Sequence, residues 1–159
     1  MVSKERQTAN TLVAAFNNMD IDTISVLRTP DCQRIFLPSS LGYAPQSNDT
    51  YHASLMAMKS VFTSFQITVN DVLEATNDSA LGGEGKKKMV MYVTARGDTV
   101  VGEYKNEYVW KMSFEEGGER ICEWSEFVDV GVSRDFMPKL KAGIAKKMAE
   151  EKERRGNVE

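Results

Sequence analysis

Two carboxylates near the end of the chain, Glu126 and Asp129, are the strongest candidates for a catalytic base. A carboxylate held in an apolar pocket can remove a proton next to a carbonyl group, the first step of many isomerisations. The segment 124–129 alternates between two faces as a strand does, and Trp124, a candidate for contact with a substrate, shares its face with Glu126. Neither face is wholly apolar, so the alternation does not decide which acid points inward. The alternative role for either acid is an ion pair with Arg34 or Arg120.

Tyr51 and His52 are the candidates for returning the proton. Tyr51 begins the apolar stripe of a predicted helix, so its hydroxyl is expected to point towards the pocket, where it donates a proton or closes a core hydrogen bond. Histidine is the usual acid/base group near neutral pH, but His52 lies about 100° around the helix from Tyr51, at the edge of the stripe. It is the single histidine of the chain, so a multi-histidine metal site is excluded and no metal is expected.

The segment 104–114 supplies further candidates for contact with a substrate. Its even positions are aromatic or apolar apart from Asn106, whereas its odd positions include Glu107 and two lysines. We therefore expect the even face to point inward, with Asn106 between Tyr104 and Tyr108. A buried amide needs a hydrogen-bond partner, so Asn106 either orients a substrate oxygen or bonds the backbone. Glu107 is expected to point outward, towards solvent or a dimer partner, unless a bulge reverses the alternation.

Arg34 is the candidate for binding negative charge. It lies in a predicted strand over 32–37 and shares a face with Cys32 and Phe36. An arginine keeps its proton, so Arg34 would hold an anion or a carbonyl oxygen rather than act as a base. The alternative is a structural ion pair with Glu126 or Asp129.

The elements that must position these residues follow from hydrophobic periodicity. Ala9, Leu12, Val13 and Phe16 predict a first helix that ends at 17–18, followed by a short helix over 21–27. The stripe Tyr51, Leu55, Met58, Phe62 and Phe65 predicts a helix of about four turns. Strands are expected over 65–74, 89–96, 101–114 and 120–130, with turns at 82–85, 97–98 and 116–119, before a last helix from 134 whose end frays over 150–155. Strands grouped after helices indicate an α+β fold rather than a parallel α/β sheet.

Four segments together resemble a known family. They are residues 14–24 (AAFNNMDIDTI), 29–32 (TPDC), 102–110 (GEYKNEYVW) and 126–129 (EFVD). Their order and spacing over about residues 5–142 resemble the SnoaL-like branch of the NTF2-like superfamily. The resemblance implies a cone of helices packed on a curved, mainly antiparallel sheet that encloses one pocket. We expect this domain over 1–145 and a charged C-terminal tail over 146–159.

Within that superfamily the chain looks most like small fungal enzymes encoded beside polyketide, xanthone and meroterpenoid pathways. Such relatives imply a cofactor-free isomerase or cyclase, often a homodimer, that uses acid/base catalysis on a small hydrophobic or aromatic substrate. The resemblance also implies that Glu126 or Asp129 is the functional carboxylate. Other members dehydrate or hydrolyse, and a non-catalytic ligand-binding or dimerisation module is a further alternative, because a fold does not determine a reaction.

Composition limits the remaining classes of function. The chain has 159 residues, 42% of them hydrophobic, which suits one globular domain. Its net charge of −3 gives no electrostatic basis for a nucleic-acid or anionic-membrane partner. No apolar run approaches the ~20 residues of a membrane span. Cys32 and Cys122 are too few for a disulfide scaffold, and a cytoplasmic location is expected.

Overall fold

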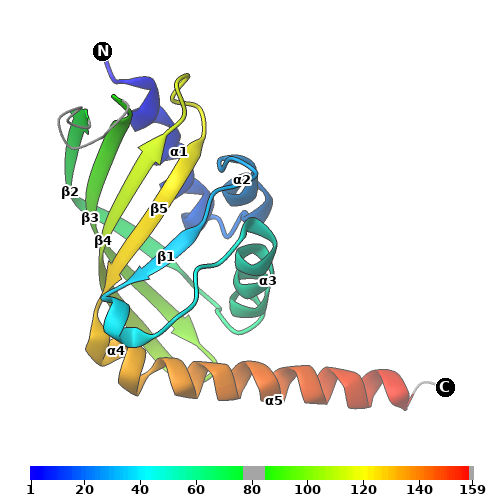
Figure 1. Cartoon of the computed structure of the whole chain (residues 1–159). Coiled ribbons are helices and arrows are strands. Elements are labelled where there is room, and N and C mark those ends of the chain that lie inside the picture. Colours follow the sequence, from blue (N-terminus) through cyan, green and yellow to red (C-terminus); the bar gives the residue numbers. More distant parts are fainter. Residues whose placement is uncertain (77–84, 158–159) are drawn as a thin grey trace.

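The protein is described by a computed structural model that covers residues 1–76 and 85–157. Five strands form one curved sheet, and α1, α2 and α3 pack against its inner face (Figure 1). The elements are α1 (Lys4–Asn17), α2 (Ile21–Val26), β1 (Arg34–Leu37), the 3-10 helix η1 (Ser39–Leu41), α3 (Asn48–Lys59), β2 (Gln66–Thr76), β3 (Lys87–Thr99), β4 (Gly102–Phe114), β5 (Ile121–Val128), α4 (Val130–Asp135) and α5 (Met137–Gly156). The predicted α+β class is confirmed. Most of the turn expected at 82–85 lies outside the described residues.

The sheet has the order β1-β5-β4-β3-β2, and only β1 pairs in parallel, with β5. In this pairing Arg34 lies beside Trp124 and Phe36 beside Glu126. The remaining neighbours are antiparallel, and a bulge between Val69 and Asp71 interrupts the register of β2. The topology therefore brings β1 next to β5, although about ninety residues separate them in the sequence.

The core lies between α1 and the inner face of the sheet. Phe16 of α1 packs against Trp110 of β4 and Trp124 of β5, with ring centroids 5.5 and 6.2 Å apart. The alternation predicted for β4 is confirmed, because Tyr104 and Asn106 are buried whereas Glu107 is exposed. The strand places one side chain on each face in turn, so a single polar residue can be recognised on the apolar face.

The helix predicted to carry five apolar positions is shorter than expected. α3 ends at Lys59, so Phe62 and Phe65 follow the helix rather than extend it. The chain leaves the helix there to pair with the β3–β4 hairpin: the Val100 N–H donates to the Val61 carbonyl at 3.1 Å, and Phe62 bridges to Thr99. Phe62 lies in the core and Phe65 packs against it, so the apolar spacing continues beyond the end of the helix.

The turn expected at 97–98 is also misplaced. β3 runs on to Thr99, and Gly97 and Asp98 pair with β4 instead of reversing the chain. A Cβ on Gly97 would lie 2.4 Å from the Ser64 carbonyl oxygen, so this glycine permits a close backbone approach inside a strand.

The C-terminal segment forms two helices where one was predicted. α4 begins at Val130, capped by the Asp129 carboxylate, and α5 continues without interruption to Gly156. The fraying expected over 150–155 is not seen there. Glu150 and Glu151 each precede an arginine by four residues, an arrangement that supports a helix. α5 crosses one end of the sheet and extends past α3 (Figure 1), and no element ends at residue 145.

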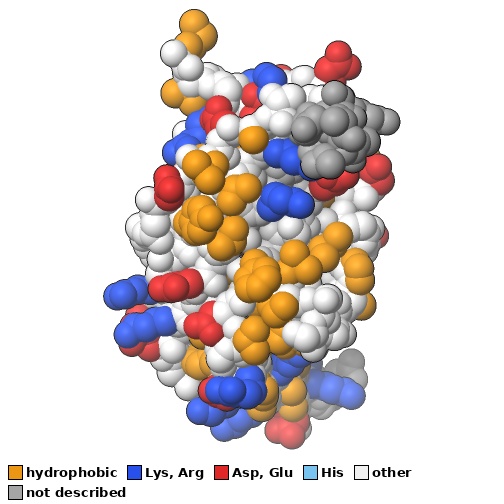
Figure 2. Space-filling view, turned by 60° about the vertical axis from the view of Figure 1, so that its left-hand side comes forward, with side chains coloured by type: hydrophobic (Ala, Val, Ile, Leu, Met, Phe, Trp, Pro, Cys, Tyr) orange, Lys and Arg blue, Asp and Glu red, His pale blue; other side chains and the backbone are white. Residues whose placement is uncertain are grey.

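The face of the sheet turned away from the helices is partly apolar (Figure 2). Exposed hydrophobic side chains come from four strands: Ile35 of β1, Leu73 of β2, Tyr92 of β3 and Phe127 of β5. Tyr92 and Phe127 both neighbour Val109 of β4, so part of this outer sheet face is continuous across three strands. Of the helices described, none combines the length and apolar character needed to cross a bilayer.

Candidate active site

Two adjoining cavities lie between the helices and the inner face of the sheet. The inner cleft, with a volume of about 60 Å³, is lined mainly by apolar side chains of α1, α2, α3 and the sheet, among them Phe16, Ile24, Tyr51, Leu55, Phe65 and Trp110. The outer chamber, of about 510 Å³, is bounded by the loop after β1, α3, β4 and α5. Arg34, Met58 and Tyr108 line both cavities. The outer chamber has the size of a small-molecule site, and the inner cleft extends it into the core.

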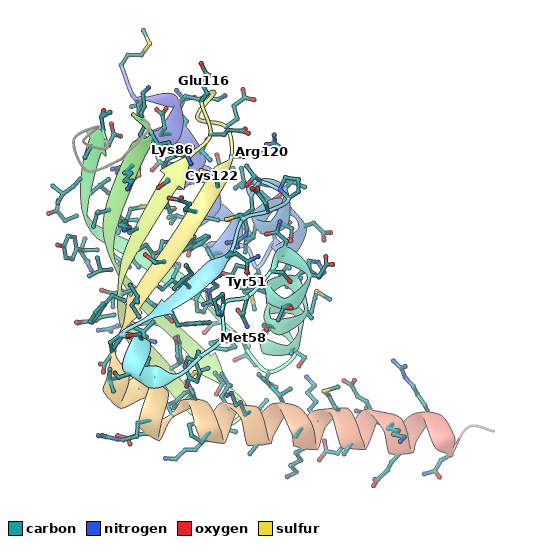
Figure 3. The ribbon with its side chains drawn as sticks, in the orientation of Figure 1. Tyr51, Met58, Lys86, Glu116, Arg120 and Cys122 are labelled. Atoms are coloured by element: carbon teal, nitrogen blue, oxygen red, sulfur yellow. The ribbon has the colours of Figure 1, made fainter. Side chains whose placement is uncertain are left out.

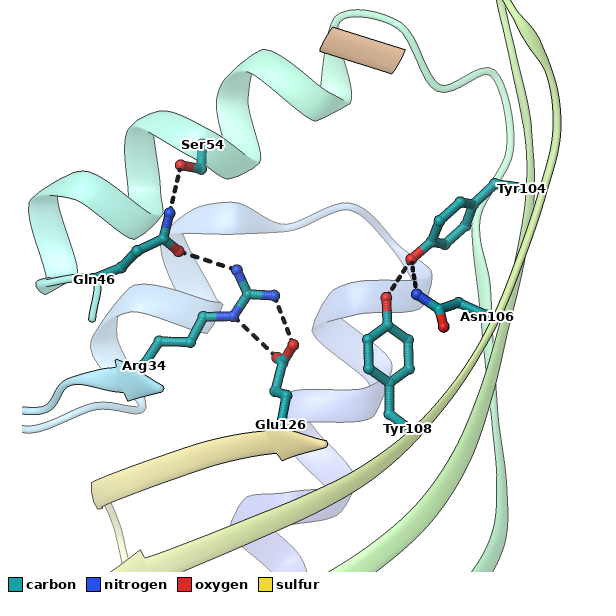
Figure 4. Close-up of polar contacts among 7 residues, drawn as sticks. All are labelled: Arg34, Gln46, Ser54, Tyr104, Asn106, Tyr108 and Glu126. Atoms are coloured by element: carbon teal, nitrogen blue, oxygen red, sulfur yellow. Dashed lines mark hydrogen bonds and ion pairs between the residues drawn. The ribbon is translucent and has the colours of Figure 1, made fainter. Parts of the chain in front are cut away.

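Arg34, which lines both cavities, forms a buried ion pair with Glu126 of the inner cleft. Arg34 Nε donates to Glu126 Oε1 at 3.0 Å, and Nη2 donates to Oε2 at 2.7 Å (Figure 4). The side chains are 13% and 2% exposed. Burial disfavours the charge of Arg34, but the Glu126 carboxylate more than offsets it, and the pKa of Arg34 is raised. The sequence offered this pairing as an alternative to function, whereas the structure places the pair on the cavity wall.

Gln46 completes the contacts of the guanidinium. Its Oε1 accepts from Arg34 Nη1 at 3.0 Å, and its Nε2 donates to Ser54 Oγ at 3.1 Å (Figure 4). The backbones of Arg34 and Gln46 also bond to each other in both directions at 2.9 Å. Sequence reasoning missed Gln46 because it lies in a loop, where no periodicity marks a side chain that faces the pocket.

Tyr51 lies at the first turn of α3, on the side that faces the sheet (Figure 3). The Arg34 guanidinium lies over its ring, 4.3 Å from the centroid. Burial raises the pKa of Tyr51, and the charge of Arg34 opposes that rise. Tyr51 lines the inner cleft, and its hydroxyl has no hydrogen-bond partner among the described residues. The hydroxyl is therefore available to a ligand.

A second polar group projects from β4. Asn106 Nδ2 donates to the Tyr104 hydroxyl at 2.8 Å, and the Tyr104 and Tyr108 hydroxyls are hydrogen-bonded to each other (Figure 4). Asn106 Oδ1 accepts from the Glu107 N–H at 2.9 Å. The hydrogen bond to the backbone that was one alternative for Asn106 is therefore formed, in addition to its contact with Tyr104. Burial raises the pKa of Tyr108 well above its ordinary value, with the Tyr104 hydroxyl and Glu126 acting in the same direction. All three side chains line the outer chamber.

Four of the sequence candidates lie away from both cavities. His52 is 40% exposed, and its Nε2 lies 3.4 Å from Asp22 Oδ1. Asp129 Oδ1 accepts from the Gly131 N–H at 2.7 Å as the cap of α4, and Glu107 and Asp129 line a shallow hollow on the outer sheet face. Trp124 lies in the core behind Tyr51, with ring centroids 6.1 Å apart. Thus Glu126, rather than Asp129, is the carboxylate at the pocket.

Residues 1–76 and 85–157 contain no group of three His, Cys, Asp or Glu side chains arranged to hold a metal ion. The other alternative weighed for the acids, a pair with Arg120, does not form there. Arg120 instead binds Glu115 through two hydrogen bonds of 2.9 Å.

No protein-family model matches the chain. Among curated proteins, it is 28% identical over 141 residues to austinoid biosynthesis clusters protein H of Penicillium brasilianum, covering 88% of this chain and 92% of that protein. It is also 28% identical over 137 residues to a protein named monooxygenase AacuP of Aspergillus aculeatus, covering 86% and 89%. The sequence relatives are thus biosynthetic proteins of fungi.

Solved structures show the same arrangement of helices and sheet. AusH from Aspergillus nidulans matches with a TM-score of 0.66 and 26% identity over 79% of this chain and 84% of that one. The BvnE pinacolase from Penicillium brevicompactum matches with a TM-score of 0.73 and 23% identity over 89% and 96%. An NTF2-like protein from Burkholderia pseudomallei matches with a TM-score of 0.64 and 18% identity over 82% and 94%. The chain has an NTF2-like fold. The NTF2-like cone expected from the four sequence segments is thereby confirmed, together with its resemblance to fungal secondary-metabolite proteins.

Proposed function

We propose that this protein is a cofactor-independent isomerase or cyclase that acts on a polyketide- or terpenoid-derived intermediate. The observation that carries the proposal is the Glu126 carboxylate, buried on the wall of the apolar inner cleft and paired with Arg34, which lines both cavities. Burying a carboxylate is costly unless it is paired, and Arg34 supplies the partner that holds Glu126 at the wall of the cleft. Relatives from fungal biosynthetic clusters and the fold shared with a pinacolase support the assignment.

The proposed mechanism begins with proton transfer from carbon to Glu126. The carboxylate keeps lone pairs beyond the two used by Arg34, so it can accept a proton from a carbon next to a substrate carbonyl. The electron pair moves to the carbonyl oxygen, and hydroxyl donors on the cavity wall stabilise the enolate. Glu126 then returns the proton to another carbon. Alternatively, the enolate carbon attacks the carbon of a second carbonyl group, whose C=O π electrons move to its oxygen and take up the proton from Glu126, so that a ring closes. Both outcomes leave the molecular mass unchanged.

Tyr108 and Tyr51 are the hydroxyl donors best placed for this role. Tyr108 lines both cavities, and when Tyr104 donates to it, its own hydroxyl proton is free for the substrate oxygen. Tyr51 lines the inner cleft. The positions of these two tyrosines favour them over His52, which lines neither cavity.

Mass spectrometry of pathway extracts with and without the protein tests the proposal. We expect one intermediate to be replaced by a product of equal mass, and we expect Glu126→Gln to reduce this conversion by about 10²- to 10⁴-fold, the usual contribution of an acid/base group. Asp129→Asn is the matched control, because it removes the other candidate carboxylate and should leave conversion nearly unchanged. Loss of activity in Asp129→Asn but not in Glu126→Gln would overturn the assignment.

The same spectra distinguish the competing functions. A product lighter or heavier by one water indicates a dehydratase or a hydrolase of the same fold. A product heavier by one oxygen atom indicates the oxidation implied by the name of the relative from Aspergillus aculeatus. No change of any metabolite indicates a non-catalytic binding or dimerisation module.

We also propose that the outer sheet face pairs two copies of the chain. Tyr92 and Phe127 are exposed on this face beside the shallow hollow that contains Glu107. A stable interface buries roughly 1,200–2,000 Å² in total. Light scattering should give a dimer for the wild type and a monomer for Phe127→Asp. Val26→Asp, at an exposed position on α2, should remain dimeric.

A further inference from the structure

Arg28 is a buried cation that the proposed mechanism does not use. It follows α2 and is 3% exposed. Its Nε donates to Asn48 Oδ1 at 2.8 Å, and its Nη2 donates to the Cys32 carbonyl at 3.4 Å. Nη1 is buried and has no partner, and no carboxylate pairs with Arg28 within the described parts of the chain. Burying a charge without a counter-ion destabilises the folded state, so the position of Arg28 calls for an explanation.

The aromatic surroundings of Arg28 connect it to the inner cleft. Its Cζ lies over the Tyr51 ring at 5.0 Å from the centroid and over the Trp124 ring at 5.4 Å. Arg34 also lies over the Tyr51 ring, so this phenol is in contact with two guanidinium groups. The charge of Arg34 is balanced by Glu126, whereas that of Arg28 is not. Arg28 itself lines neither cavity, so any effect on a ligand must pass through Tyr51.

We propose that Arg28 is a positioning residue that keeps Tyr51 ready to donate its hydroxyl proton to a substrate oxygen in the inner cleft. The proposal rests on the proposed function. When Glu126 takes a proton from carbon, the electron pair moves to the substrate oxygen, and the Tyr51 O–H bond gives its proton to that oxygen. The resulting tyrosinate carries the negative charge beside the unbalanced cation of Arg28. The proton returns to Tyr51 when the carbonyl re-forms and Glu126 protonates carbon, so the protein regains its starting state.

The charged and titratable groups around Tyr51 determine the sign of the effect. They are Arg28 from the segment after α2, Cys32, Arg34 of β1 and Glu126 of β5. Burial of the phenol raises its pKa most, Arg34 and Arg28 oppose the rise, and Glu126 and Cys32 add to it. Removing the charge of Arg28 therefore leaves Tyr51 a weaker acid and a poorer proton donor.

The test measures the ionisation of Tyr51 directly. A fluorinated tyrosine at position 51 ionises at lower pH than tyrosine, and its near-ultraviolet absorbance can be titrated in the folded protein. Arg28→Met keeps the length of the side-chain stem and removes the charge, and we expect it to raise the titration midpoint by about one pH unit, a tenfold weaker acid. Arg28→Lys should restore most of the difference. Arg120→Met removes an exposed, paired arginine and should leave the midpoint unchanged.

Asn48→Asp provides a second variant in case Arg28→Met does not fold. It places a carboxylate at the atom that now accepts from Arg28 Nε, so it neutralises the cation without removing the guanidinium. We expect the midpoint to rise as in Arg28→Met. A midpoint that is unchanged in a folded Arg28→Met or Asn48→Asp protein would overturn the proposal and leave Arg28 a structural role only.

Kinetics separate this proposal from the proposed function. Arg28→Met should lower kcat up to about tenfold with little change in KM, since one pKa unit corresponds to a tenfold change in acidity. In a Tyr51→Phe background the same substitution should have little further effect, because the group through which Arg28 acts is absent. The titration does not require turnover, so it tests the effect of Arg28 on Tyr51 even if the isomerase assignment fails.

Discussion

The Arg34–Glu126 pair should contribute strongly to stability, and Glu126→Leu tests this. The substitution removes the carboxylate from a pair whose side chains are only 13% and 2% exposed and leaves the guanidinium without its main partner. Removing one partner of a buried ion pair costs about 3–5 kcal/mol. In a domain of this size about 1 kcal/mol corresponds to a shift of Tm by roughly 2–4 °C, so Tm should fall by about 6–20 °C.

The double variant separates the interaction energy of the Arg34–Glu126 pair from the packing of each side chain in the core. Arg34→Met alone leaves Glu126 buried without its cation, and Arg34→Met with Glu126→Leu removes both charges. Because most of the cost in each single variant is an unpaired buried charge, the double variant should recover at least about 2 kcal/mol of the summed losses. Urea unfolding of the wild type and the three variants gives the four free energies of unfolding.

The exposed pair Arg120–Glu115 supplies the matched control. It has the same two-bond geometry, at 2.9 Å for each bond, but its side chains are 46% and 27% exposed. Water screens such a pair, so Glu115→Leu should cost less than about 1 kcal/mol. A loss in Glu126→Leu as small as in Glu115→Leu, or a double variant that loses the full sum, would refute the view that Arg34 and Glu126 form a desolvated pair.

Three further predictions concern single positions. Because burial raises the pKa of Tyr108, the folded state holds the phenol proton more tightly than the unfolded state does. The resulting contribution to the free energy of unfolding is complete below pH about 10 and is lost as the pH rises further. Urea unfolding between about pH 9 and 11 should therefore show a smaller loss of stability in Tyr108→Phe than in the wild type. Burial raises the pKa of Cys32 to about 11, so a maleimide should label Cys122 first, and equal labelling rates would contradict the burial of Cys32. Gly97→Ala should lower the free energy of unfolding by about 1–3 kcal/mol, because the added Cβ would collide with the Ser64 carbonyl oxygen. Gly117→Ala is the control and should be nearly neutral, since its Cβ would have no neighbour nearer than 4.0 Å. Equal losses in chemical unfolding would refute the close approach at Gly97.

Local patterns in the sequence predicted the elements well where a single strand or helix has one clearly apolar face. β4 is the best example, because its even positions were expected to point inward and its odd positions outward, as the structure shows for Tyr104, Asn106 and Glu107. The helix over Ala9–Phe16 was found for the same reason. The boundaries failed where a long-range contact overrides the local pattern, as at Phe62, which leaves α3 to pair with the β3–β4 hairpin.

The candidate site could be predicted only in part. Glu126, Arg34, Tyr51 and the polar residues of β4 were identified as polar groups near apolar stripes, and the structure brings them to the same two cavities. The choice between Glu126 and Asp129 could not be made, because both faces of β5 carry polar and apolar residues. Neither Gln46 nor Arg28 was identified, since both lie outside regular elements, where no period shows which way a side chain points.

The sequence by itself determined the α+β class, the NTF2-like resemblance, the inward face of β4 and the set of residues able to do acid/base chemistry. Helical and strand periods are properties of neighbouring residues, so they can be read without knowing the fold. Only the tertiary structure decided that Arg34 pairs with Glu126 and that the Tyr51 ring contacts the guanidinium groups of Arg28 and Arg34. These contacts depend on the parallel pairing of β1 with β5 and on the packing of α3 against the sheet, which join residues up to 92 positions apart.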